Sequence, residues 1–436
     1  MIRRMASRQR KGDPRSGTGN AAETNGGRPR VVVVGGGFAG LSAVRELSSA
    51  DVDVLLLDRD LYSTFQPLLY QVATGGLNPG DVTYALRAFA ARFGNAQFRR
   101  VCVSGVDAAR RCVRSDAGEE IGYDYLVLCC GVTANYFGIP GAEEHARPLY
   151  TRKAAIQVRD VLLGNLEDVA QDRPEALEPV VVIVGGGPTG VEMAGTLAEL
   201  RNIALPVTYP ELDLKRVRVV LVEMTDHLLG PFAPRLRRYT AKQLRKRGVE
   251  LRLGTAVKEV HQDCAVLGNG ERVPSAATIW ATGVKVHDQV AGWGLPQGRG
   301  GRIQVEPDMR VVGHPEIFAI GDVAASVSGP LPQLAQPAIQ GGRHAAVQIR
   351  RLIAGEPTEP MVYKDKGTMA TIGRSAAVVQ LPWGLKVKGR IAWLAWVALH
   401  IIMLVGQRNR LATLANLSVR YLAWPGRLNV IVGDPP

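Results

Sequence analysis

The sequence has little cysteine and no long hydrophobic run. Its five cysteines among 436 residues form no CxxC pair and no group of four, which argues against a zinc ribbon, an iron–sulfur centre and a disulfide framework. We therefore expect no resident metal and a reduced, cytoplasm-facing chain. No run reaches the ~20 apolar residues that a membrane-spanning helix needs, so a polytopic membrane protein is excluded. The length suffices for two or three domains with hydrophobic cores.

Acidic residues are scarce at the two ends of the chain, and the net charge of +13 comes from there. Residues 30–365 sum to zero, whereas residues 1–29 and 366–436 are strongly basic. The first 29 residues are rich in Arg, Gly, Ser and Thr and lack the hydrophobic segment of a signal peptide. We expect a disordered basic tail there.

A β-branched run at residues 31–34 leads directly into a GxGxxG pattern and a helical segment. In this context Gly35 allows a tight turn, Gly37 lets the backbone approach a pyrophosphate, and Gly40 lets the helix pack closely on the strand. The apolar strand 54–57 then ends in Asp58, whose carboxylate can accept hydrogen bonds from a ribose. The pattern predicts a dinucleotide site made by Gly35, Gly37, Phe38, Ala39, Gly40 and Asp58.

The same arrangement recurs further along the chain. Residues 180–184 lead into a second glycine motif, and the strand 219–222 ends in Glu223. Each half closes with a strand and a turn of small residues, at 129–131 and 281–283, at nearly the same distance from its first motif glycine. The second site is predicted to use Gly185, Gly187, Pro188, Thr189, Gly190, Glu192, Glu223 and Gly283. Two dinucleotide sites favour electron transfer from a nicotinamide to a flavin.

A further apolar strand, 316–320, ends in Gly321 and Asp322. With it, the sequence resembles the flavoproteins that have two dinucleotide-binding domains, in which the first Rossmann-like domain holds FAD and the second, inserted in the first, holds NAD(P)H. The resemblance implies that Gly321 and Asp322 meet the ribityl and pyrophosphate part of FAD, and that Glu223 holds the adenosine ribose of the nicotinamide. Because a carboxylate repels a 2′-phosphate, NADH is favoured over NADPH.

The α/β fold that this resemblance implies divides the chain into four parts. We expect the tail at 1–29, an FAD-binding domain from 30–148 and 284–383, an NADH-binding domain at 149–283, and a C-terminal membrane-association region at 384–436.

The stretch 65–76, FQPLLYQVATGG, has no cysteine where disulfide reductases and sulfide:quinone reductases place theirs. It resembles the corresponding stretch of type II NADH:quinone oxidoreductases, the single-subunit, non-proton-pumping NADH dehydrogenases of respiratory chains. Segments 187–195, 335–340 and 365–374 agree with that family's motifs. The turn Cys129-Cys130-Gly131 departs from the family's Ala-Thr-Gly, and Asp58 stands where Glu is frequent. We expect Cys129 and Cys130 to pack as small hydrophobic residues.

The resemblance suggests residues for catalysis. Gln336 and Gln340, spaced i and i+4 on one helical face, are predicted to hydrogen-bond the quinone, and Gln336 also to contact FAD. Helix-capping or surface amides are the alternative. Glu192 is a candidate for proton delivery, although an acid early in a helix is also favoured by the helix dipole alone. Lys388 could assist, or could be a basic membrane contact.

The region after residue 384 combines apolar and basic residues. Residues 391–405 form a run that is too short to span a bilayer, and no acid occurs between Asp365 and Asp434. This pattern is typical of helices that lie on anionic lipid, and a nucleic-acid partner is disfavoured because the apolar run is continuous. A buried or dimer-forming helix is the alternative.

The sequence thus predicts a peripheral membrane protein on the cytoplasmic face of the inner or plasma membrane. It would pass a hydride from NADH to FAD and two electrons to menaquinone or ubiquinone, and it leaves a homodimer open. The competing interpretations are a reductase with another acceptor, either a ferredoxin-type reductase or a protein like apoptosis-inducing factor.

Overall fold

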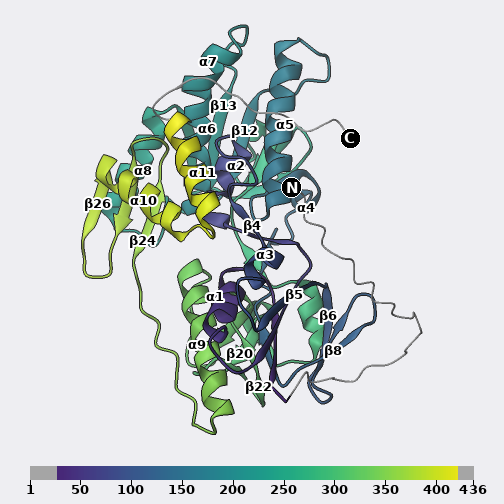
Figure 1. Cartoon of the computed structure of the whole chain (residues 1–436). Coiled ribbons are helices and arrows are strands. Elements are labelled where there is room, and N and C mark those ends of the chain that lie inside the picture. The colour runs from purple at the N-terminus through teal and green to yellow at the C-terminus, as the bar shows by residue number, and fades with distance from the viewer. Residues whose placement is uncertain (1–26, 421–436) are drawn as a thin grey trace, which may run out of the picture.

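The computed structural model describes residues 27–420 (Figure 1). Two α/β units lie one above the other, and the C-terminal elements lie along their side. Most of the predicted tail at 1–29 and the end of the predicted membrane-association region lie outside the described residues.

The first unit is built on an eight-stranded sheet in the order β23-β20-β21-β22-β9-β1-β2-β5. Its strands are β1 (Arg30–Val34), β2 (Asp53–Asp58), β5 (Ala96–Arg100), β9 (Tyr125–Leu128), β20 (Ile303–Val305), β21 (Arg310–Val311), β22 (His314–Ala319) and β23 (Ala324–Ser326). The valines of β1 are buried because β1 pairs in parallel with both β2 and β9 and helices cover the sheet. Helices α1 (Phe38–Leu47) and α9 (Ala335–Ile353) pack on each other.

Smaller elements complete this unit. They are the pair β3 (Tyr62–Thr64) and β4 (Thr83–Ala85), the three-stranded sheet β6 (Val103–Asp107), β7 (Cys112–Ser115) and β8 (Glu120–Gly122), and the short helices α2 (Leu69–Ala73) and α3 (Leu86–Ala90).

The second unit has a five-stranded parallel sheet in the order β11-β18-β12-β13-β14. The strands are β11 (Ala146–Pro148), β12 (Val180–Val184), β13 (Arg218–Glu223), β14 (Val249–Leu253) and β18 (Ala277–Trp280), and the helices α4 (Ala142–His145), α5 (Arg152–Ala170), α6 (Pro188–Glu199), α7 (Leu205–Thr208) and α8 (Pro234–Lys246) accompany them. A hairpin sheet, β15 (Val257–Val260), β16 (Cys264–Leu267) and β17 (Arg272–Pro274), lies beside it.

This unit is inserted, because the strands of the first sheet resume after it. The two connecting segments pair antiparallel as β10 (Thr133–Ala134) and β19 (Val284–Lys285). Residues 146–148, which we expected at the end of the first domain, pair with β18 and so belong to the second sheet.

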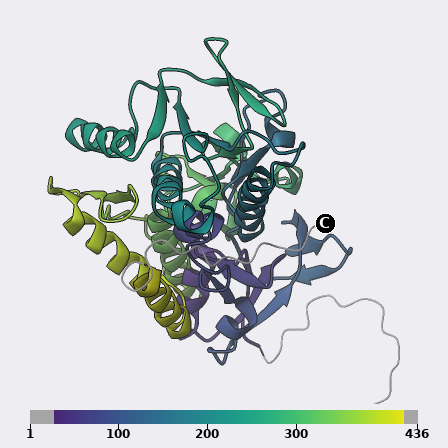
Figure 2. The ribbon, with the colours of Figure 1, turned by 90° about the horizontal axis from the view of Figure 1, so that it is seen from above.

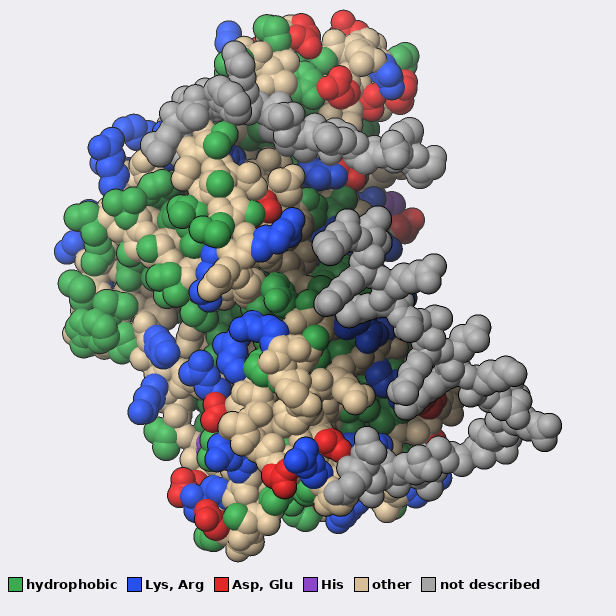
Figure 3. Space-filling view, in the orientation of Figure 1, with side chains coloured by type: hydrophobic (Ala, Val, Ile, Leu, Met, Phe, Trp, Pro, Cys, Tyr) green, Lys and Arg blue, Asp and Glu red, His purple; other side chains and the backbone are tan. Residues whose placement is uncertain are grey.

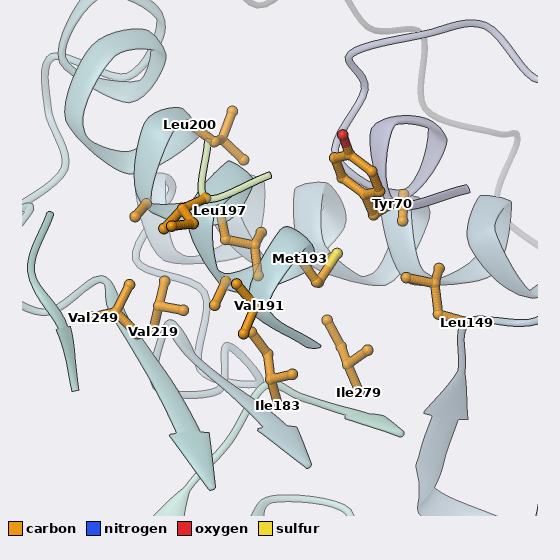
Figure 4. Close-up of a cluster of buried hydrophobic side chains, with 14 of the residues drawn as sticks. Tyr70, Leu149, Ile183, Val191, Met193, Leu197, Leu200, Val219, Val249 and Ile279 are labelled. Carbon is orange, nitrogen blue, oxygen red and sulfur yellow. The ribbon is translucent and has the colours of Figure 1, made fainter. Parts of the chain in front are cut away.

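The core of the second unit extends to the first. Ile183, Val219 and Ile279 of the sheet lie beneath α6, and Tyr70 of α2 lies above that helix, near Met193 (Figure 4). Tyr70 is 2% exposed. The stretch 65–76 therefore joins the two units by burying apolar side chains against the inserted one.

The C-terminal elements form a third layer. Strands β24 (Thr368–Thr371), β25 (Ala377–Gln380) and β26 (Lys386–Gly389) make an antiparallel sheet, which the sequence did not predict and which crosses the boundary expected at 383/384. Helices α10 (Arg390–Met403) and α11 (Gln407–Ser418) follow, and they run along one side of the molecule (Figure 2). Within residues 27–420, no helix has the length and apolar content to cross a bilayer.

Candidate functional site

The first glycine motif forms the turn between β1 and α1. Gly35 has φ +110°, and a Cβ on it would lie 2.4 Å from the carbonyl oxygen of Cys129. A Cβ on Gly40 would lie 1.9 Å from the Gly35 oxygen, so both positions must be glycine for the chain itself to fold this way. A Cβ on Gly37, which precedes α1, would meet open space. That space adjoins the helix N-terminus, where backbone N–H groups and the helix dipole favour a pyrophosphate.

The second motif repeats this geometry between β12 and α6. Gly185 has φ +111°, and a Cβ on it would lie 2.8 Å from the Ala281 oxygen. A Cβ on Gly190 would again lie 1.9 Å from the oxygen of the first motif glycine. Gly187 faces open space, and Pro188 and Thr189 form the first turn of the helix. The two cradles therefore leave the same position free for a ligand.

The acids that end β2 and β13 are held in matching ways. Asp58 accepts a hydrogen bond from the Gly36 N–H at 2.6 Å, and Glu223 accepts one from the Gly186 N–H at 2.6 Å. The second oxygen of each carboxylate accepts from a backbone N–H two residues on, at Asp60 and Thr225. Burial raises the pKa of Asp58. Each acid is thus fixed beside its glycine turn, as a ribose ligand requires.

Gly321 and Asp322 lie against the first motif. A Cβ on Gly321, which has φ +76°, would be 3.6 Å from the Cβ of Ala39. The hydroxyl of Tyr150 donates to the Asp322 carboxylate at 3.3 Å, and burial raises the pKa of that carboxyl. The sequence analysis missed Tyr150, because it lies 172 residues from Asp322 and in no motif.

The turns at 129–131 and 281–283, which close the two halves of the repeat, have the same backbone conformation at their glycines. Gly131 and Gly283 both have φ +66°, which explains glycine at each. Cys129 is buried, and burial raises the pKa of the Cys129 and Cys130 thiols, which disfavours the reactive thiolate form of each.

Glu192 is a buried carboxyl in the second turn of α6. Its side chain is shielded from solvent, with 7% of the residue exposed, and accepts a hydrogen bond from the Thr371 N–H of β24 at 3.3 Å. Burial raises its pKa to about 8, against the lowering effects of Thr371 and of Trp396 from α10. The carboxyl is therefore poised to exchange a proton near neutral pH, which a solvated acid at a helix N-terminus would not do.

Aromatic side chains of α10 cover this region. His400 stacks on Trp396 with ring centroids 3.9 Å apart, and its Nδ1 lies 2.7 Å from the Trp396 carbonyl oxygen. Burial lowers the pKa of His400 to about 4, so the ring is neutral at pH 7. Phe65 contacts His400 edge-on and also contacts Phe38 of the first motif. The sequence analysis gave Trp396 and His400 no individual role.

A small pocket opens next to Glu192. Thr371 and Thr196 line it, and each is hydrogen-bonded to Glu192, Thr196 through the Glu192 carbonyl. Its other walls come from α2 and the turn before it, from α10 and α11, and from the turn after β24, namely Leu68, Tyr70, Gln71, Trp393, Trp396, Val397, Leu417 and Gly373. The pocket thus lies between two residues bonded to Glu192 and the C-terminal helices.

Gln336 and Gln340 lie at the start of α9, on one helical face as predicted, with Gln340 Nε2 3.5 Å from Gln336 Oε1. The Gln340 amide also binds the chain that leads to β24. It donates to the Lys364 carbonyl at 2.9 Å and accepts from the Lys364 N–H at 3.0 Å. Neither glutamine belongs to the lining of the pocket beside Glu192.

Lys388 lies on the exposed side of β26, with its ammonium 5.1 Å from the centroid of the Tyr239 ring. Within the described part of the chain, no three His, Cys, Asp or Glu side chains are grouped as metal ligands would be.

Comparison with known proteins agrees with this geometry. Residues 29–342 match the pyridine nucleotide-disulphide oxidoreductase family, and residues 366–425 match the NDH2 C-terminal domain. That second match begins just before the β24–β26 sheet.

Two curated relatives come from Mycobacterium tuberculosis. The chain is 35% identical to type II NADH:quinone oxidoreductase Ndh, over 91% of this chain and 89% of that protein, and 36% identical to NdhA, over 91% and 88%. The structure of NDH2 from Plasmodium falciparum in complex with NADH has a similar fold, with a TM-score of 0.83 and 19% identity over 91% of this chain and 99% of that one.

Proposed function

The chain belongs to the type II NADH:quinone oxidoreductases, and from this premise we propose how its residues divide the work. It is an FAD-dependent NADH:quinone oxidoreductase, and neither the ferredoxin-type nor the apoptosis-inducing-factor-like interpretation is favoured. FAD, when bound, accepts a hydride from NADH and returns two electrons to the quinone, without proton pumping. The observation that carries the proposal is the pair of matching nucleotide cradles next to a buried carboxyl under the C-terminal helices.

The first cradle suits FAD. We assign the pyrophosphate to the open space at Gly37, the adenosine ribose to Asp58, and the ribityl side to Gly321 and Asp322, which lie against the same motif. Tyr150 holds the Asp322 carboxylate in place. The fit rests on the open space beside Gly37, at the positive end of α1.

The second cradle suits NADH. Gly187 leaves room for the pyrophosphate, and Glu223 is oriented by Gly186 and Thr225 towards the ribose. The three residues directly after Glu223, Met224, Thr225 and Asp226, supply no cation, and the Glu223 carboxylate would repel a 2′-phosphate. NADH is therefore preferred to NADPH.

On the quinone side, we assign proton delivery to Glu192. Reduction of a quinone to a quinol takes up two protons with two electrons, and a carboxyl with a pKa of about 8 can supply one and be reloaded. The pocket lined by Tyr70 and Trp396 provides the adjoining space. Gln336 is the better candidate for a quinone carbonyl, because both hydrogen-bonding atoms of the Gln340 amide are engaged by Lys364.

Membrane association follows from the exposed side of the C-terminal elements. We define its apolar face by the exposed side chains of the β25–β26 turn, α10 and α11: Trp383, Leu385, Ile391, Leu394, Leu399, Ile402, Leu411 and Leu414. These side chains gather on one side of the molecule, with Lys and Arg around them (Figure 3). A short amphipathic layer of this kind lies in the interface and admits an isoprenoid quinone, menaquinone or ubiquinone. We place it on the cytoplasmic face, where NADH is available.

The test separates the two half-reactions in the purified FAD-loaded protein. NADH should bleach the flavin absorbance faster than NADPH does, and a short-chain ubiquinone or menaquinone analogue should restore it. Gln336→Ala and Glu192→Gln should slow the second step far more than the first, with Glu175→Gln on an exposed loop as control. Equal slowing of both steps would contradict the assignment. Light scattering on the same samples decides between a monomer and a homodimer.

A further inference from the structure

Four arginines from three helices and one turn lie near one another beside the apolar face. Arg45 lies in the last turn of α1, Arg92 follows α3, Arg343 lies on α9 and Arg410 on α11. Burial lowers the pKa of Arg45, and the positive charges of Arg92, Arg343 and Arg410 lower it further, with no carboxylate opposing them. Four like charges are thus brought together by elements that are distant in the sequence.

The side chains are held in place by neighbouring groups. The guanidinium carbon of Arg45 lies 5.9 Å from the centroid of the Phe89 ring, and that of Arg92 lies 5.9 Å from the Phe93 ring. These two rings contact each other edge to face at 5.3 Å. Arg410 donates from Nε to the Leu404 carbonyl oxygen at 2.9 Å. The guanidinium groups of Arg45 and Arg92 thus lie near aromatic rings and that of Arg410 is held by a carbonyl, while all four arginines are exposed residues.

Carboxylates do not neutralise this cluster. Across residues 27–420, no Asp or Glu makes a salt bridge with Arg45, Arg92, Arg343 or Arg410. The positive charges of the other three arginines therefore disfavour the charged form of Arg45, and a bound anion would oppose this effect. Guanidinium groups are suited to phosphate because their N–H donors match two of its oxygens.

We propose that this arginine cluster binds the headgroup phosphate of an anionic phospholipid at the edge of the membrane-facing surface. The inference rests on the membrane association proposed above and adds the first unit to it. The cluster is continuous with the apolar face, since exposed Leu411 directly follows Arg410 and Leu414 lies one turn further on. Lys and Arg side chains lie between the apolar patch and α1 below it (Figure 3).

A lipid fits this arrangement better than a free phosphate does. The phosphate would meet the guanidinium groups, and the acyl chains would lie along the exposed leucines of α11. A free phosphate would use the charge and leave the adjoining apolar side chains in water. The lipid also ties the first unit, through α1 and α9, to the same surface that carries α10 and α11.

The experiment measures flotation of the full-length FAD-loaded protein with two kinds of vesicle, one of phosphatidylcholine and one of equal parts phosphatidylcholine and phosphatidylglycerol. The double variant Arg45→Gln/Arg343→Gln should bind the anionic vesicles about tenfold more weakly than the wild type. The matched control, Arg114→Gln/Arg299→Gln, removes the same charge from exposed positions elsewhere and should change binding by less than about twofold. NADH oxidation with a water-soluble quinone should be equal in all three, which verifies their folding.

The outcomes separate this inference from the proposed function. If the wild type floats with neither vesicle, membrane association itself fails. If it floats equally with both, or if the two double variants lose binding alike, membrane association stands and the headgroup site is overturned. Binding of inorganic phosphate without lipid, with no preference for anionic vesicles, identifies a free-phosphate site and overturns the lipid. Loss of a dimer by Arg45→Gln/Arg343→Gln, with vesicle binding unchanged, identifies a subunit contact instead.

Discussion

Replacing Glu192 with glutamine should make the folded protein less sensitive to alkaline pH. The carboxyl is buried in α6, and burial raises its pKa from the ordinary value of 4.5 to about 8. In the unfolded chain the same group has its ordinary pKa. Between these two values the native state holds a proton that the unfolded state has lost, so this group makes the free energy of unfolding fall as pH rises.

The size of the effect follows from the difference between the two pKa values. At about 1.36 kcal/mol for each pKa unit, the destabilisation reaches about 5 kcal/mol above pH 8 and vanishes below pH 4.5. Glutamine keeps an oxygen that can accept the Thr371 N–H and never ionises. The variant should therefore gain stability relative to the wild type as pH rises through this window.

Guanidinium unfolding of both proteins, at about pH 5 and about pH 9, measures this gain. We expect the difference in unfolding free energy between Glu192→Gln and the wild type to grow by at least about 2 kcal/mol between the two conditions. Glu175→Gln, on an exposed loop, should show no such growth. A difference for Glu192→Gln that is the same at both pH values would refute the argument, because it would mean that the carboxyl ionises freely in the folded state.

Three further predictions concern the nucleotide sites. Gly37→Val should abolish FAD retention, measured by the flavin absorbance of the purified protein, while changing the stability of the apoprotein by only about 0.5 kcal/mol. Gly40→Val, whose Cβ would lie 1.9 Å from a backbone oxygen, should instead prevent folding. Equal folding defects in the two variants would contradict the assignment of Gly37 to the pyrophosphate. Glu223→Gln should raise KM for NADH about tenfold and reduce the preference over NADPH in steady-state assays, and unchanged constants would remove Glu223 from the ribose site. Tyr150→Phe should weaken FAD binding by about 1 kcal/mol in a fluorescence titration, whereas unaltered affinity would show that Asp322 needs no such support.

The nucleotide cradles were predictable from the sequence because they depend on local backbone geometry. A glycine with φ near +110°, a close helix–strand contact and an acid at the end of the next strand are encoded within a few residues of each motif. The repetition of this pattern predicted the inserted unit, which the sheet order confirms. The short helices α10 and α11 were expected from the apolar run and its basic flanks.

Other features could not be predicted, because the groups involved are far apart in the chain. The strands β24–β26 are short and their pairing depends on long-range contacts rather than on a strong local pattern. Tyr150 reaches Asp322 only through the packing of the two units. Gln340 shows the same limit. Its spacing from Gln336 could be read from the sequence, but its hydrogen bonds to Lys364 could not be predicted.

The sequence by itself determined that the chain has two dinucleotide cradles, because phosphate cradles and ribose acids are local motifs with a required spacing. Only the tertiary structure decided the electrostatics around them. Glu192 differs from an ordinary helix acid because β24 and α10 cover it and raise its pKa. The arginine cluster exists because α1, the turn after α3, α9 and α11 bring charges from separate segments of the chain to one place. Desolvation and Coulomb interactions depend on distance in space, which position in the chain does not specify.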